Sequence, residues 1–132
     1  MSGAWSQTLA VALGGAFGAV LRYAINQFFL RHGYGGVPSA TLVVNVVGCF
    51  CAGLFLVWIE QRIDPAFWRA LLITGVLGAL TTFSALGLEV WQLLRAERWG
   101  LIAITLAAHV GLGVFAVGSG WHLGQALWGP RG

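Results

Sequence analysis

The sequence has little charge and no lysine. Only 8% of its 132 residues are Asp, Glu, Lys or Arg, and all seven basic residues are arginines. Because soluble domains carry about a quarter charged residues, this chain has too few to cover a surface that faces water. Hydrophobic residues make up 58% of the chain, and the mean hydropathy is +0.83. The composition excludes an ordinary soluble domain and predicts a protein embedded in a lipid bilayer.

Cysteine is scarce as well. The two cysteines, Cys49 and Cys51, lie two residues apart on one predicted helix. Side chains at this spacing point to different sides of a helix, so the thiols cannot form a disulfide without breaking it. We expect both to be free thiols in the core, and they do not indicate a redox compartment.

Long apolar runs are what the chain does have. Four runs are each long enough to cross a bilayer, which takes roughly 20 apolar residues. We place the spans approximately at residues 8–30, 37–59, 67–92 and 99–126. No basic residue precedes the first run, so we interpret it as a span rather than a signal peptide. The sequence predicts a single all-α membrane domain over residues 1–132, with no room for a soluble domain and no indication of nucleic-acid binding.

The arginines are divided evenly between the two sides of such a bundle. With four spans, the first and third loops share one side, and the second loop shares the other side with the termini. The first side holds Arg31, Arg95 and Arg98, and the second holds Arg62, Arg69 and Arg131. Since an excess of Lys and Arg normally marks the cytoplasmic side, this balance predicts insertion in both orientations and an antiparallel dimer. A fixed orientation set by another signal is the alternative.

Several features have simple structural interpretations. Asp64 followed by Pro65 is typical of a helix N-cap and first helical position. Gly14 and Gly18 are four residues apart and allow another helix backbone to approach closely. The seven tryptophans fall mostly near the ends of the predicted spans, as expected for an interfacial belt.

Polar side chains inside the spans are the candidates for function. Arg22 interrupts the first span, where it must pair, face water or reach the interface as an anchor. Thr41 and Asn45 share one face of the second span, and Thr105 and His109 share one face of the fourth. Hydrogen bonding between helices is the structural alternative for these groups. His109 has no second His or Cys at ligand spacing, which argues against a transition-metal site.

The third span is unusual in its middle, where Gly75, Gly78, Thr81, Thr82 and Ser84 lie. β-Branched residues beside glycine weaken a helix, and hydroxyl groups compete for backbone hydrogen bonds. A continuous packed helix is one interpretation. The other is a helix unwound at the bilayer midplane that presents backbone carbonyls to an ion, which is allowed only where the backbone is buried in protein or lines a cavity.

Three segments, in this order, resemble the Fluc (CrcB-type) family of fluoride channels. They are GGAFGAVLRY (14–23), VNVVG (44–48) followed by Phe50 and Gly53, and GVLGALTTFS (75–84). The resemblance implies a passive, fluoride-selective channel, not an enzyme, that exports cytosolic fluoride across the inner membrane of a bacterium. It also implies an antiparallel dual-topology homodimer, with the third helix broken at mid-membrane and two pores lined by both subunits.

The resemblance also assigns roles to particular residues. The backbone carbonyls of Gly78 and Thr81 are expected to hold a central structural sodium ion. Arg22 and Glu89 are expected to supply charge at a vestibule or pore mouth. The residues expected along the fluoride pathway are Asn45, Phe83, Thr41, Ser84, Thr82, Thr105 and His109. Hydrogen-bond donors and positive potential are what a pore must offer a small, strongly hydrated anion.

Two places depart from the family pattern. Leu86 stands where a second aromatic residue is usual, and Thr105 and His109 stand where Tyr and Ser are usual. Leu86 leaves open one subunit of a heterodimeric fluoride channel, in which a partner chain supplies the missing ring. Because imidazole changes its charge near neutral pH, His109 predicts a fluoride flux that rises on acidification.

Two other classes of protein are weighed against the channel. A small dual-topology, proton-coupled transporter needs a membrane-embedded carboxylate, and Glu89 is the only acid inside the predicted spans. An intramembrane enzyme would use Ser84 as nucleophile and His109 as base, but no third group is evident to orient the histidine.

Overall fold

Four apolar stretches of the chain form long helical segments. The structure is a computed structural model that describes residues 2–33 and 39–129. Three of the stretches are single helices: α1 (Ser2–Arg31), α2 (Ala40–Glu60) and α6 (Trp99–Trp128). The remaining stretch, Pro65–Arg95, is called the third span below. It consists of α3 (Pro65–Trp68), the π-helix η1 (Arg69–Leu77), α4 (Gly78–Leu80) and α5 (Phe83–Arg95). All four stretches are long and apolar enough to cross a membrane.

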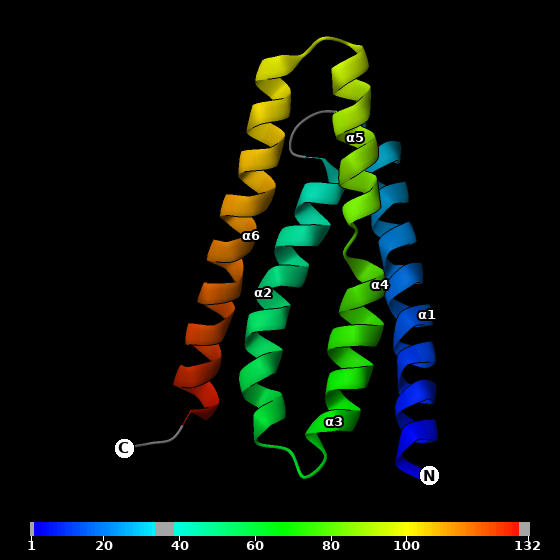
Figure 1. Ribbon diagram of the computed structural model, residues 1–132, viewed down its shortest axis with the longest axis vertical. Coiled ribbons are helices and arrows are strands. Elements are labelled where there is room, and N and C mark those ends of the chain that lie inside the picture. The colour runs from blue at the N-terminus through cyan, green and yellow to red at the C-terminus, as the bar shows by residue number, and fades with distance from the viewer. Residues whose placement is uncertain (1, 34–38, 130–132) are drawn as a thin grey trace.

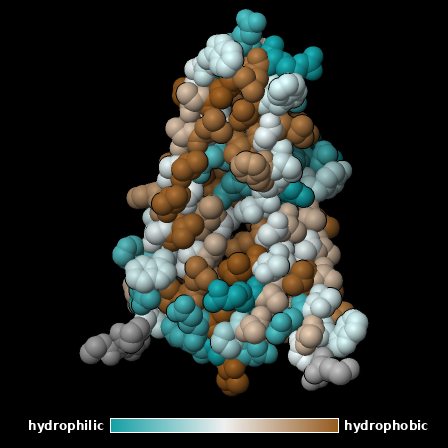
Figure 2. Space-filling model, viewed as in Figure 1, coloured by the Kyte–Doolittle hydropathy of each residue, from teal (hydrophilic) through white to brown (hydrophobic). Residues whose placement is uncertain are grey.

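Apolar side chains cover much of the outside of the bundle. Leu13, Val114 and Phe115 are each at least 70% exposed in the single chain. Figure 2 shows hydrophilic residues gathered at the two ends and in a smaller group partway along, with hydrophobic residues between them. A surface of this kind is unsuited to water, and helices satisfy their own backbone hydrogen bonds, as a bilayer requires. The chain is an all-helical, multi-pass membrane protein.

The helices are arranged as two pairs of parallel neighbours (Figure 1). α1 lies beside the third span, and α2 lies beside α6. The N-terminus, the α2–α3 connection and the end of α6 lie at one end of the bundle, and the α5–α6 turn lies at the other. The first end carries Arg62 and Arg69, and the second carries Arg31, Arg95 and Arg98. Arg131 lies outside the described residues, and insertion in both orientations stays a prediction.

Glycines line the contact within each pair. A Cβ atom at Gly14 or Gly18 would collide with the backbone of η1, so α1 and η1 meet backbone to backbone. The α2–α6 contact has the same character, because a Cβ atom at Gly53 or Gly120 would collide with the backbone of the other helix. We call these two contacts the glycine seams. The prediction that Gly14 and Gly18 allow close helix packing is confirmed.

The two cysteines lie on different sides of α2. Cys51 packs against the apolar core of Val44, Leu77 and Leu80, which joins α2 to the third span. Cys49 faces α6, where its Sγ lies 3.5 Å from the position that a Cβ atom of Gly113 would occupy. Both thiols are free, so the prediction that they do not pair is confirmed, although both residues are only partly buried rather than in the core.

The third span begins as predicted and then departs from a regular α-helix. The Asp64 side chain accepts a hydrogen bond from Phe67 N at 3.0 Å, and Pro65 occupies the first turn. The next nine residues form the π-helix η1. The π-helix was not expected, because an apolar run has the same composition in either kind of helix. Wide turns of this type are rare and occur frequently at functional sites.

Candidate functional site

The third span is interrupted at Thr81 and Thr82, which we call the break. α4 ends at Leu80 and α5 begins at Phe83, and the two residues between them have extended backbone with ψ angles of 154° and 120°. Figure 1 shows this non-helical stretch between α4 and α5. Within Pro65–Arg95 the break lies near the middle of the sequence.

At the break, the side chain of Asn45 forms the hydrogen bonds with Thr82 that backbone groups would form in a continuous helix. Asn45 Oδ1 accepts a hydrogen bond from Thr82 N at 2.8 Å, and Asn45 Nδ2 donates to the Thr82 carbonyl at 3.2 Å. An amide group offers two donors and one acceptor oxygen, so one Nδ2 proton stays available after both bonds are made. Asn45 therefore holds α2 to the extended backbone and still has a donor to offer.

Two carbonyls lose their usual helical donors as a result. In a continuous α-helix the Gly78 carbonyl would accept from Thr82 N, and the Thr81 carbonyl from Ala85 N. Thr82 N donates to Asn45 Oδ1 instead, and Ala85 N donates to Thr82 Oγ1 at 3.2 Å. Carbonyls at the end of a helix carry partial negative charge. Unwound backbone carbonyls of this kind coordinate sodium in transport proteins, so Gly78 and Thr81 fit a cation site.

Thr81 is held by the helical turn before the break and by α2. Its N–H and its hydroxyl both donate to the Leu77 carbonyl, at 2.9 and 2.8 Å. Its methyl group lies against Gly48 of α2, where a Cβ atom would collide with it. The absence of a side chain at Gly48 thus lets the break approach α2. This contact places the end of α4 against the same helix that carries Asn45.

Polar residues recur at a spacing of one helical turn on both α2 and α6. The two helices run parallel, with Gly113 opposite Cys49. Before Cys49 on α2 lie Asn45 and Thr41, one and two turns back, and before Gly113 on α6 lie His109 and Thr105, also one and two turns back. Both threonines are buried, at 6% and 8% exposure. We call Thr41, Asn45, Thr105 and His109 the polar stripe.

The start of α5 presents different groups to the inside and the outside of the chain. Phe83 is 83% exposed, whereas Leu86, one turn later, is only 8% exposed. Ser84 is exposed, and its Oγ lies 3.0 Å from Thr82 Oγ1. The aromatic ring is therefore free to contact lipid, an ion or a second chain. Leu86 instead contributes to the interior of its own chain.

The two charged residues singled out from the sequence have different surroundings. Arg22 is half-buried on α1, one turn beyond Gly18 and so level with the break. It forms no ion pair with any residue in the described ranges. Glu89 Oε2 accepts a hydrogen bond from Ser39 Oγ at 3.0 Å, and the same Oγ caps α2 by accepting from Leu42 N at 3.1 Å. Ser39 was not singled out, although serine before an apolar run is a typical N-cap.

The arrangement offers electrostatics rather than bond-breaking chemistry. Ser84 Oγ is engaged with Thr82 Oγ1, and His109 Nδ1 lies 2.9 Å from the Thr105 carbonyl of its own helix. In the part of the chain that the structure describes, the serine and the histidine do not form a nucleophile and base pair. What the site provides is carbonyl oxygens for a cation, and amide, hydroxyl and ring-edge groups for an anion.

The fold and site define a class: a multi-pass helical membrane protein with an interrupted span and polar groups around the interruption. Comparison with known proteins identifies the family within this class. Residues 9–121 match the family described as CrcB-like protein, Camphor Resistance (CrcB), and the chain belongs to this family.

Relatives match almost the whole chain. "Fluoride-specific ion channel FluC" of Xanthomonas euvesicatoria pv. vesicatoria (strain 85-10) is 43% identical over 125 residues, which cover 93% of each chain. The protein of the same name from Rhizobium etli (strain CIAT 652) is 48% identical over 122 residues, 92% of this chain and 98% of the relative. The Xylella fastidiosa (strain M23) channel is 40% identical over 121 residues, 91% of each. The resemblance stated from the sequence is confirmed, and the family is one of ion channels rather than enzymes.

Proposed function

We propose that this chain forms a passive, fluoride-selective channel that lets fluoride leave a bacterial cell through the inner membrane. The observation that carries the proposal is the break at Thr81 and Thr82, where Asn45 takes over the backbone hydrogen bonds. An interruption of this kind is tolerated in a bilayer only where the backbone is buried in protein or lines a cavity. The names of the relatives supply the identity of the ion.

Fluoride places strict demands on such a pathway. The anion is small and strongly hydrated, so a pore must replace its water with donors and positive potential at close range. Asn45 has an amide proton left to donate, and the hydroxyls of Thr41 and Thr105 lie along the same pathway. The edge of the Phe83 ring is electropositive and faces an anion without holding it as tightly as a cation would. Several weak sites favour passage over trapping.

Charged and hydroxyl groups complete the pathway. Arg22, level with the break, attracts anions toward it. Glu89 accepts a hydrogen bond from Ser39 at the start of α2 and lies near a pore mouth. Its negative charge lowers the local concentration of anions there. Thr82 and Ser84, joined through their hydroxyls, offer further donors beside Phe83.

The working unit is an antiparallel, dual-topology homodimer in which two copies bring their breaks together at the bilayer midplane. The exposed Phe83 ring and the even distribution of arginines support this arrangement. At the two-fold axis, the carbonyls of Gly78 and Thr81 from both copies hold a structural sodium ion. A bound cation there supplies fixed positive potential for anions nearby.

Flux measurements test the channel function. Liposomes containing the purified chain alone are loaded with potassium fluoride or potassium chloride, and efflux of each anion is followed with an ion-selective electrode. Fast fluoride efflux with chloride retained supports a homodimeric channel despite Leu86. Retention of fluoride overturns a self-sufficient channel and leaves the heterodimer or the transporter to be tested.

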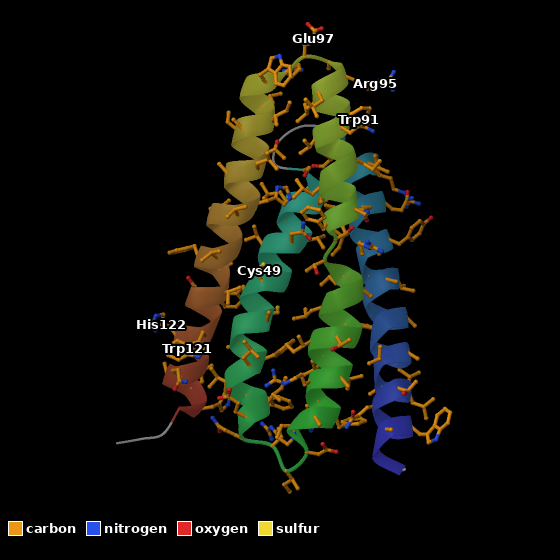
Figure 3. All side chains as sticks on the ribbon, viewed as in Figure 1. Cys49, Trp91, Arg95, Glu97, Trp121 and His122 are labelled. Atoms are coloured by element: carbon orange, nitrogen blue, oxygen red, sulfur yellow. The ribbon has the colours of Figure 1, made fainter. Side chains whose placement is uncertain are left out.

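Labelling from the two sides of a vesicle tests the topology. Ile63, at the α2–α3 connection, is fully exposed, and Glu97 is exposed at the opposite end of the bundle (Figure 3). Ile63→Cys and Glu97→Cys, each made with both native cysteines replaced by alanine, are treated with an impermeant thiol reagent. Dual topology predicts labelling of about half of each variant from outside. Complete labelling of one variant and none of the other would show a single orientation.

Cation exchange tests the sodium site. A ligand that binds only the folded state stabilises it, by about 2.7 kcal/mol at one hundred times its dissociation constant. The dimer is therefore expected to unfold at a higher temperature in sodium than in potassium or a large organic cation. Equal unfolding temperatures in all three would argue against a structural sodium ion while leaving the flux result intact.

A further inference from the structure

His109 occupies a position in α6 where one ring nitrogen is fixed by the helix itself. Its Nδ1 lies 2.9 Å from the Thr105 carbonyl. A carbonyl oxygen only accepts hydrogen bonds, so Nδ1 carries the proton and donates. In the neutral ring the other nitrogen, Nε2, then has a lone pair and no proton. The tautomer of the neutral His109 ring is thus set by its own helix.

Nε2 is buried, and no residue of the described ranges forms a hydrogen bond with it. His32 provides a contrast, because its Nδ1 makes the same bond to the Phe28 carbonyl one turn earlier, at 2.8 Å, yet His32 is exposed. The bond from Nδ1 to the carbonyl of the preceding turn therefore does not by itself distinguish His109 from the exposed His32. What distinguishes His109 is a buried Nε2 that lacks a partner, which costs free energy unless something else fills the role.

The titratable and charged groups around His109 do not supply that partner. On α2, which packs against α6, these are Cys49, which lies against Gly113 one turn after His109, and then Cys51 and Glu60 farther along. On α5 they are Glu89, bound to Ser39, and Arg95 near the end of the helix. On α6 itself they are Arg98 at the start and His122 toward the other end. In the described residues none of them bonds to Nε2.

We propose that His109 Nε2 is a proton-controlled ligand for fluoride, an inference that rests on the proposed channel function. With the ring neutral, Nε2 presents a lone pair to the anion, and two acceptors repel each other. With the ring protonated by water from the pathway, Nε2–H donates a charge-assisted hydrogen bond, the stronger kind. Protonation forms an N–H bond at Nε2 and breaks an O–H bond of a hydronium ion in the pathway, and the proton returns to water when the ion leaves. Fluoride flux through this channel therefore rises as the pH falls.

Flux at several pH values tests the control by protons. Efflux is measured with equal pH on both sides between about pH 8 and pH 5.5, and protein-free liposomes give the leak of neutral hydrogen fluoride to be subtracted. Wild-type flux is expected to rise about fivefold to tenfold over this range, in which imidazole changes its charge. His122→Gln is the matched control, because His122 projects from the outside of α6 beside Trp121 (Figure 3) and keeps the wild-type profile.

Two substitutions at position 109 distinguish the roles of the two ring nitrogens. Glutamine places an amide nitrogen near the position of Nε2, and asparagine places one near that of Nδ1. His109→Gln is expected to conduct fluoride at a rate that does not vary with pH, because its donor is permanent. His109→Asn is expected to conduct more slowly than His109→Gln, also without pH dependence. A pH-dependent flux that persists in both variants overturns the proposal.

Magnetic resonance gives a readout independent of flux. With ¹⁵N-labelled histidine in the wild-type dimer, fluoride is expected to increase the protonated fraction of His109 at a fixed pH, and chloride is not, because binding and protonation are linked. The His109→Gln spectrum assigns the signal. No response to fluoride overturns the proposal. If wild-type efflux does not depend on pH, the proposal for His109 fails but the channel function stands. If there is no efflux at any pH, the channel function fails.

Discussion

The glycine seams and the break hold helices together by opposite means. At the α2–α6 seam, a Cβ atom at Gly53 or Gly120 would collide with the backbone of the facing helix. The helices approach closely because side chains are missing, and the contact is close packing without directional bonds. At the break, by contrast, the contact with α2 depends on two hydrogen bonds between Asn45 and Thr82.

Gly48 joins the two kinds of contact. It lies on α2 like Gly53, yet the space it leaves open is filled by the methyl group of Thr81. Close packing without side chains brings the break to α2, and the amide of Asn45 then satisfies the backbone there. The difference shows that the glycine seams determine how closely the helices approach, whereas the break determines which polar groups are available to an ion. Substitutions in the seams should therefore reduce stability first, and substitutions at the break should reduce flux first.

Asn45→Asp has the largest expected effect. The carboxylate keeps an acceptor for Thr82 N but loses the donor to the Thr82 carbonyl, and its charge repels fluoride. We expect fluoride efflux to fall at least about a hundredfold, since both the donors and the favourable potential of the site are removed. Efflux from liposomes measures the effect.

Asn45→Ala separates the two roles of the amide. Alanine removes both hydrogen bonds and leaves part-buried backbone groups of Thr82 unpaired, which costs up to about 1–3 kcal/mol. The alanine variant carries no repelling charge, so its flux separates the loss of the donor from the effect of the added charge. Wild-type flux in the aspartate variant would show that Asn45 is only a structural support.

Gly120→Ala tests the seam. Its new Cβ atom meets the Phe50 carbonyl and Leu54 N, neither of which can move without separating the helices. The free energy of unfolding is expected to fall by about 1–3 kcal/mol, as in other overpacked sites, measured by thermal or denaturant unfolding in detergent. Gly118→Ala is the matched control on the same helix, because nothing lies within 4 Å of its Cβ position. Equal losses in both variants would disprove the seam as described.

Phe83→Leu should affect flux without affecting stability. The ring is 83% exposed in the chain, so its removal should change the stability of the single chain by no more than about 0.5 kcal/mol. Leucine lacks the electropositive ring edge, and we expect fluoride flux to fall about tenfold, equivalent to about 1.4 kcal/mol in the barrier. Phe115→Leu is the control, since Phe115 is 73% exposed on α6 and has no assigned role. A flux loss of the same size in Phe115→Leu would contradict a specific role for Phe83.

Ser39→Ala has the smallest expected effect. Alanine removes the N-cap of α2 and the hydrogen bond to Glu89, and the loss of a cap typically costs about 1 kcal/mol. Ser119→Ala is the comparison, because within the described ranges the Ser119 hydroxyl bonds only to the Phe115 carbonyl of its own helix. If both variants unfold alike, the link from α2 to α5 contributes nothing measurable.

Some parts of the site could be predicted because their chemistry is local. Thr81 and Thr82 beside Gly78 weaken a helix wherever they occur, so the interruption was one of two interpretations that the sequence supported. Asp64 and Pro65 mark a helix start by their own side chains. Asn45 stood out because an amide inside an apolar span must find a hydrogen-bond partner.

Other parts could not be predicted, since they depend on residues far apart in the chain. Asn45 and Thr82 are 37 positions apart, and Ser39 and Glu89 are 50 apart. No sequence pattern tells which backbone group an amide will meet. The inward position of Leu86 and the outward position of Phe83 likewise depend on how α5 leaves the break, because the extended residues change the direction in which the helix faces.

The sequence by itself determined the class of this protein, its four apolar spans, its family and the short set of polar residues within the spans. These follow from composition and motif, because polar groups inside a bilayer are costly and are therefore few, paired or functional. The tertiary structure decided which groups meet: the amide of Asn45 on the backbone of Thr82, Ser39 on Glu89, and glycine against backbone in each seam. It also left His109 Nε2 buried without a partner among the residues that the structure describes. The physical reason is that hydrogen bonds and close packing depend on distances of a few ångströms, which only the packing of the helices against one another sets.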